Sequence, residues 1–126
     1  MAFRKIERQA SLGAGIKTTV RIAHNTPAGP LITIPRAVAN LAGIAAGDRV
    51  DIMIDTDQTI AKIAVVSKGD GRKAFAQREG GPICIVAGQL REHIPRMRTT
   101  PVSHEIGLVE DRHAIIFAVP ARTKTA

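Results

Sequence analysis

The chain has 126 residues, and its 18 Lys and Arg against 11 Asp and Glu give a formal net charge of +7. This length fits one domain, whose core must be aliphatic because the sequence has three Phe and neither Trp nor Tyr. The single cysteine excludes an intramolecular disulfide framework, and no apolar run reaches the ~18 residues of a membrane span. Charged residues interrupt the N-terminal segment where a signal peptide would be apolar, so we expect a cytoplasmic protein.

The first half of the chain is predicted to be rich in strands. Residues 16–23 are β-branched at alternate positions and predict a strand, and residues 24–29 predict a loop. A short strand follows at 31–34. Pro35 ends it and suits the first position of a helix over 36–41.

A tight turn is predicted after this helix. Gly43 fits the left-handed residue that ends a helix, and Gly47 allows the positive φ of a turn. Asp48 can then accept hydrogen bonds from backbone N–H groups of the turn. A hairpin follows, with strands at 50–55 and 59–66.

The second half is expected to repeat this order. A helix is predicted at 89–94, ended by Pro95, and a hairpin with strands at 102–108 and 113–119 around a turn at 109–111. The chain ends, 1–12 and 121–126, are expected to be flexible polar tails.

Residue identities also repeat between the halves. Gly29-Pro30 recurs 52 positions later as Gly81-Pro82, and each pair precedes an apolar run. We therefore predict a single domain of two pseudo-repeats, about 13–66 and 69–120, that share one core. That core is expected to contain Val50, Ile52, Ile54, Ile60, Ile63, Val65, Val102, Ile106, Ile115, Phe117 and Val119.

The segment from Ile32 to Ile52 resembles the AbrB-like (SpoVT–AbrB and MazE-antitoxin) family. It contains Thr33-Ile34-Pro35, then Gly43-Ile44 and Gly47-Asp48, in the family's order. The resemblance implies an all-β fold with two short helices, a small interlocked barrel of the AbrB-like or double-psi type. In this family two units from two chains interlock as swapped hairpins; here both units would belong to one chain.

The same resemblance implies a function. AbrB-like proteins bind double-stranded DNA as transcription regulators or antitoxins, so a homo-oligomer or a toxin partner is compatible with it. Together with the basic charge it predicts a DNA-binding face on the first strand and loop, continued by cations of the second repeat. The expected contacts are Lys17, Arg21, Arg36, Arg72, Lys73 and Arg91. Gly47 and Asp48 are expected to be structural.

Other residue groups favour neither catalysis nor a cofactor. The four histidines lack metal-ligand spacing, and Ser103-His104-Glu105 lacks a nucleophile elbow and an ordered third partner. The loop 69–73 lacks the spacing of a phosphate-binding P-loop. Arg91, Arg96 and Arg98 form the densest basic group, which fits phosphate contact and a solvated surface equally well. We expect neither an enzyme, a metal site nor a cofactor.

Two alternatives to a DNA-binding regulator remain. Binding of single-stranded nucleic acid is disfavoured because such proteins stack bases on aromatic side chains, which this chain nearly lacks. The second alternative is a non-enzymatic structural or protein-interaction module, for instance a phage or mobile-element accessory protein.

Overall fold

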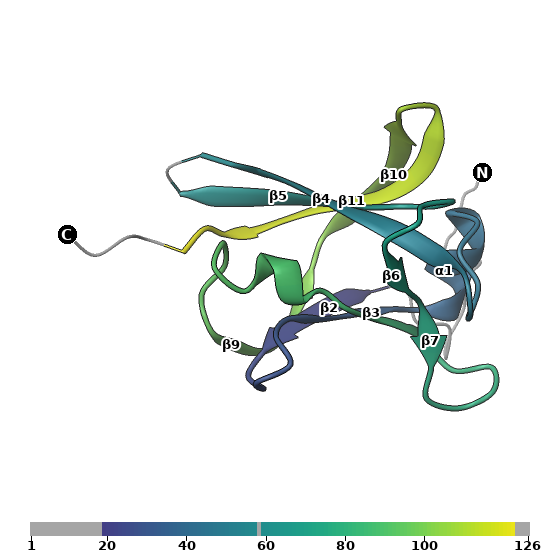
Figure 1. Ribbon diagram of the computed structural model, residues 1–126, viewed down its shortest axis with the longest axis horizontal. Coiled ribbons are helices and arrows are strands. Elements are labelled where there is room, and N and C mark those ends of the chain that lie inside the picture. The colour runs from purple at the N-terminus through teal and green to yellow at the C-terminus, as the bar shows by residue number, and fades with distance from the viewer. Residues whose placement is uncertain (1–18, 58, 123–126) are drawn as a thin grey trace, which may run out of the picture.

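Strands are the main regular elements of the described residues, and they lie in two layers with one short α-helix at one end (Figure 1). The computed structural model describes residues 19–57 and 59–122. The elements are β2 (Val20–His24), β3 (Leu31–Ile34), α1 (Arg36–Leu41), β4 (Arg49–Thr56), β5 (Ile60–Val66), β6 (Arg72–Lys73), β7 (Phe75–Ala76), β8 (Ile83–Val86), the 3-10 helix η1 (Gly88–Leu90), β9 (Met97–Val102), β10 (His104–Val109) and β11 (Arg112–Pro120).

The strands form two five-stranded antiparallel sheets. One has the order β10-β11-β5-β4-β6, and the other has the order β7-β8-β3-β2-β9. Within the described residues the strand pairing does not close into a barrel. Over the described ranges the chain passes between the sheets three times: through α1 between β3 and β4, at Ala74 between β6 and β7, and at Ser103 between β9 and β10.

Local structure in the first half agrees with the sequence. Strand β3 and helix α1 have the predicted bounds, and Pro35 occupies the N-cap position. Gly43 follows the helix with a φ of +72°, and Gly47 has a φ of +94°. The Asp48 carboxylate accepts a hydrogen bond of 2.9 Å from the Ala45 N–H, so it binds the backbone of the turn as predicted.

The second half departs from the prediction at its helix. Only Gly88–Leu90 is helical, as a 3-10 turn, and irregular turns follow up to Ile94. Glycine at the first position stabilises a helix poorly, and Pro95 disfavours helical dihedrals at the residue before it. These two residues disfavour a regular α-helix over 89–94, and that part of the prediction is wrong.

The strand predicted at 102–108 is also wrong as one element. The chain forms two strands, β9 and β10, on either side of Ser103, and they belong to different sheets. Strand β9 contains Pro101, whose missing N–H weighs against a strand in the sequence. It is tolerated because β9 lies at the edge of its sheet. The short strands β6 and β7 were not predicted either, since the residues before them look like a polar turn.

One hydrophobic core lies between the sheets. Of the predicted core residues, Val50, Ile63, Val65, Ile115, Phe117 and Val119 are buried in it. Ile52, Ile54 and Val102 are partly buried and pack against this core. The prediction is wrong for Ile60 and Ile106, whose exposed fractions are 48% and 37%. Both lie on hairpin strands, at positions that the opposite sheet leaves uncovered.

The pairing register relates the two halves. In the β3–β8 pair Leu31 lies opposite Val86 and Ile34 lies opposite Ile83. At the spacing of 52 seen in the sequence, Leu31 corresponds to Ile83 and Ile34 to Val86, so the counterparts of two paired residues are also paired. This relation is compatible with a twofold axis between the halves, although any antiparallel pair of strands has it.

Two further pairings obey the same rule with small changes in spacing. Ile63 on β5 lies opposite Phe117 on β11, its own counterpart at a spacing of 54. Val20 lies opposite Val102, and Arg49 lies opposite Lys73, which is the equivalent pairing at a spacing of 53. That last spacing makes Thr100 and Pro101 the counterparts of Gly47 and Asp48.

Candidate nucleic-acid interface

Arg72 and Arg91, two of the six predicted contact residues, meet at Gly88. A Cβ atom placed on Gly88 would lie 3.2 Å from Nη2 of Arg91 and 3.4 Å from Nη2 of Arg72. The two guanidinium groups are therefore no further apart than the sum of these distances. Nη2 of Arg91 also donates a hydrogen bond of 3.1 Å to the Ala28 carbonyl, which fixes the direction of its side chain.

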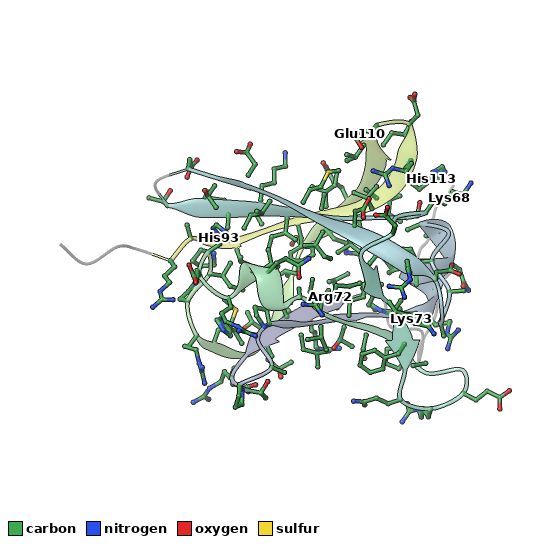
Figure 2. The ribbon with its side chains drawn as sticks, in the orientation of Figure 1. Lys68, Arg72, Lys73, His93, Glu110 and His113 are labelled. Carbon is green, nitrogen blue, oxygen red and sulfur yellow. The ribbon has the colours of Figure 1, made fainter. Side chains whose placement is uncertain are left out.

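Lys73 and Arg49 extend this group. Their Cα atoms are paired between β6 and β4, and both residues line a cavity of about 390 Å³ together with Arg72 and Phe75. Nη1 of Arg49 donates a hydrogen bond of 2.8 Å to the Gly71 carbonyl. We call Arg49, Arg72, Lys73 and Arg91 the Gly88 cation cluster; Figure 2 labels Arg72 and Lys73, which belong to β6.

The other predicted contacts lie elsewhere. Arg36, at the start of α1, donates a hydrogen bond of 2.9 Å from Nε to the Gly81 carbonyl. Arg21 is half-buried on β2, at a position that alternates with the buried Val20 and Ile22, so it faces away from the core. Lys17 lies outside the described residues.

The β3–β8 pair separates Arg36 from the cluster. Arg36 follows the C-terminal end of β3, where Ile34 pairs with Ile83. Gly88 follows the C-terminal end of β8, where Val86 pairs with Leu31. Three residues of antiparallel strand span roughly 10 Å, so the predicted contacts form two groups rather than one continuous face.

Sequence reasoning missed Arg49. Arg49 directly follows the predicted Gly47-Asp48 turn. A long cation at such a position is well placed to face solvent. The signal that identifies it is its pairing with Lys73, which depends on a short strand that the sequence did not reveal.

The cations of the Gly88 cation cluster differ from Arg112 in their ion pairing with acidic residues. Among the described residues, both ion pairs belong to Arg112, which contacts Asp51 and Glu110 at 2.8 Å each. The hydrogen bond from Arg112 holds the pKa of Asp51 below its usual value of 3.8. The four cluster cations form no ion pair with an acidic residue of the described ranges, so their charge remains available to an anion.

The described ranges contain neither a cluster of metal-binding side chains nor a helix that could span a membrane. There, no three side chains of His, Cys, Asp and Glu gather closely enough to hold a metal ion. Neither α1 nor η1 has the length of a membrane-spanning helix. His24, His93, His104 and His113 lie on separate elements and form no common site.

Comparison with known proteins finds no relative of this chain. No family model matches the chain, and neither a curated protein nor a solved structure matches it. The AbrB-like resemblance therefore depends on the residues between Ile32 and Ile52, and the proposals below depend on those residues and on the geometry described above.

Proposed function

We propose that the protein is a DNA-binding transcription regulator or an antitoxin-like protein, and that the Gly88 cation cluster contacts the phosphate backbone of double-stranded DNA. The observation that carries the proposal is the convergence of Arg72 and Arg91 at Gly88, beside Arg49 and Lys73. Four cations without acidic partners among the described residues favour a polyanion, because phosphate contacts release condensed counterions.

The register symmetry supports an AbrB-like architecture for the same chain. We propose that the halves are pseudo-repeats, folded on one another as two swapped-hairpin units are in a dimer. Two observations favour it: the β2–β9 and β4–β6 pairs correspond to one another at a spacing of 53, and one core lies between the sheets. The crossings at Ala74 and Ser103 join the sheets at both edges, as an interlocked barrel requires.

The cluster has the side chains for backbone contact. A guanidinium carries five N–H donors, so Arg49 and Arg91 keep most of theirs after binding Gly71 and Ala28. These two carbonyl contacts orient the arginines before DNA arrives, which lowers the entropy lost on binding. Base contacts, where present, would come from arginines, which can form paired bonds to guanine edges.

The cluster favours double-stranded over single-stranded nucleic acid. Phe75 is the aromatic side chain beside the cluster, and its exposed fraction is 37%. Single-strand binders place several aromatic rings along the chain of bases, each contributing roughly 1–3 kcal/mol by stacking. One partly covered ring does not provide such a platform.

A gel-shift series tests the function. The protein is titrated against double-stranded DNA, single-stranded DNA and RNA of equal length, from about 50 to 200 mM salt. We expect the tightest binding to double-stranded DNA and a steep loss of affinity with salt. Salt-independent binding, or no binding at the lowest salt, would reject the proposal.

A protein-interaction module is the second candidate function, and β10 favours it. This strand lies at the edge of its sheet, and Leu108 and Ile106 on one of its faces are 64% and 37% exposed. Unpaired strand edges with apolar side chains are sites where a further strand can add. If DNA binding fails, Leu108→Lys distinguishes this role, because it should abolish any self-association seen by analytical ultracentrifugation.

A further inference from the structure

A second cavity lies on the other side of Arg91. Its volume is about 570 Å³, within the usual range for small-ligand sites. Three segments distant in sequence form its walls: the end of β2 with the loop after it, the turn after η1, and the chain after β11. The lining residues are His24, Thr26, Pro27, Arg91, Ile94, Pro95, Arg96, Ala121 and Arg122.

Backbone contacts hold the last of these segments in place. The Ala121 N–H donates to the Thr59 carbonyl at 2.9 Å, and the Arg122 N–H donates to the His93 carbonyl at 2.8 Å. Figure 2 shows His93 next to the strand that leads to this end of the chain. The sequence placed Ala121 and Arg122 in a polar tail, yet these bonds bring Arg122 to the cavity wall.

The charge of the cavity is of one sign. Three arginines line it, and no aspartate or glutamate does. Like charges in a shared cavity repel one another, and the apolar walls of Ile94 and Pro95 strengthen that repulsion by excluding water. An anion carrying two or more charges would remove this repulsion and could accept several guanidinium bonds at once.

His24 adds a buried polar group to the same cavity. Its side chain is almost fully buried, at 4% exposure, and Nδ1 lies 3.2 Å from the Pro95 carbonyl. Because a carbonyl only accepts, Nδ1 carries the proton. Nε2 has no hydrogen-bond partner among the described residues, and it donates a hydrogen bond to an anion when the ring carries a proton there as well. Buried polar groups usually have hydrogen-bond partners, so a ring nitrogen without one among the described residues is a position that a ligand in this cavity can contact.

We propose that this cavity binds the phosphate or diphosphate group of a small ligand, with Arg91, Arg96 and Arg122 as the cationic contacts and His24 as a buried polar contact. The site is separate from the proposed DNA interface except for Arg91, which lies between the two. A bound ligand would therefore compete with DNA for Arg91 and lower the affinity for DNA.

Isothermal titration with inorganic pyrophosphate tests the site, using the complete chain at about 0.15 M ionic strength. The variants are Arg96→Gln and Arg122→Gln, and the matched control is Arg78→Gln, in the loop between β7 and β8. We expect saturable one-to-one binding that either pocket variant weakens by about tenfold or more, with no change in the control. Circular dichroism melting curves show whether each variant is folded.

Three results would overturn the proposal. The first is absence of saturable pyrophosphate binding by the parent protein. The second is an equal loss in Arg78→Gln, which would indicate attraction by net charge alone. The third is loss of DNA binding but not of pyrophosphate binding in Arg96→Gln and Arg122→Gln, which would place this cavity in the DNA interface. Failure of DNA binding in the parent leaves the pyrophosphate result unaffected, so the two proposals fail separately.

Discussion

The two ends of the β3–β8 pair are equivalent in register but different in chemistry. At one end Gly29 approaches Gly88, and Arg72 and Arg91 meet there. At the other end Gly81 approaches Arg36, whose Nε is already bonded to the Gly81 carbonyl. At the first end two guanidinium groups gather around Gly88, whereas at the other end the Arg36 guanidinium holds two chain segments together.

This difference indicates that the first half contributes mainly to stability and the second half mainly to binding. The first half retains the residues that specify the fold, namely Pro35, Gly43, Gly47 and Asp48. The second half has Thr100-Pro101 at the positions whose pairing corresponds to Gly47-Asp48, and only the short η1 in place of a helix, but it carries three of the four cations in the cluster. Substitutions in the first half should therefore change stability, and those in the second half should change binding.

The largest stability effect is expected at the Gly29 end. Gly29 has a φ of +103°, and a Cβ atom there would lie 2.9 Å from the Gly88 Cα atom. Gly29→Ala should therefore cost roughly 2–4 kcal/mol, from backbone strain and overpacking together. Urea unfolding followed by circular dichroism measures it.

The matched substitution at the other end is Gly81→Ala. Its nearest contact is the flexible Arg78 Cγ atom at 2.8 Å, which can move away. We expect a cost of about 1 kcal/mol or less. Equal costs at the two ends would show that the close approach of Gly29 to Gly88 does not exclude a Cβ atom at position 29.

Gly47→Val tests the turn of the first half. The space around Gly47 is open, but its φ of +94° strains a β-branched residue by roughly 1–3 kcal/mol. Thr100→Val at the equivalent position introduces the same side chain into an ordinary strand and should cost less than about 1 kcal/mol. Unfolding curves that rank these variants in reverse would contradict the assignment of the turn.

Asp48→Ala should have a smaller effect. It removes the acceptor of the Ala45 N–H, and the expected loss is about 1 kcal/mol because the site is exposed. Asp48→Asn keeps an acceptor oxygen and serves as the control. If alanine and asparagine lower the melting temperature equally, the side-chain bond contributes nothing to stability.

The smallest effect is expected at the Asp51–Arg112 pair, which joins the halves. Asp51→Asn should cost up to about 1 kcal/mol at neutral pH, since both side chains are partly exposed. The folded pKa of Asp51 is lowered, so the pair stabilises above the unfolded pKa of about 3.8 and loses that contribution as the pH falls through the folded value.

Unfolding at neutral pH and in strongly acidic buffer checks this pH dependence. The difference between parent and Asp51→Asn should disappear in acid. Asp55→Asn, on the same strand, is the control, because Asp55 forms no ion pair with a described residue. A pH-independent difference would show that the charge of Asp51 is not what stabilises the pair.

The sequence was most informative where a residue type is suited to one particular backbone conformation and so marks a turn or the end of an element. Pro35, Gly43 and Gly47 did so, and β3 and α1 were predicted at their observed bounds. The break at Ser103 was not predictable, because strand propensity does not say when a chain leaves one sheet for another. That crossing depends on which strand each segment pairs with.

The candidate site was predictable only in part, for a related reason. Arg72 and Arg91 were named as contacts from charge and from the repeat, but their meeting at Gly88 depends on tertiary structure. Arg36 was placed with them, although its guanidinium serves the Gly81 loop. Charge is visible in a sequence, whereas the choice between binding the backbone and facing solvent is not.

The salt dependence of DNA binding tests the central claim most directly. It is measured by fluorescence anisotropy for the parent, for Arg72→Gln/Arg91→Gln and for Arg21→Gln/Arg36→Gln, which remove equal charge from the two regions. We predict that the first double variant reduces the slope of log K against log salt by about two units and the second by less than one. Equal reductions, or a larger one for Arg21→Gln/Arg36→Gln, would contradict the assignment of DNA binding to the Gly88 cation cluster.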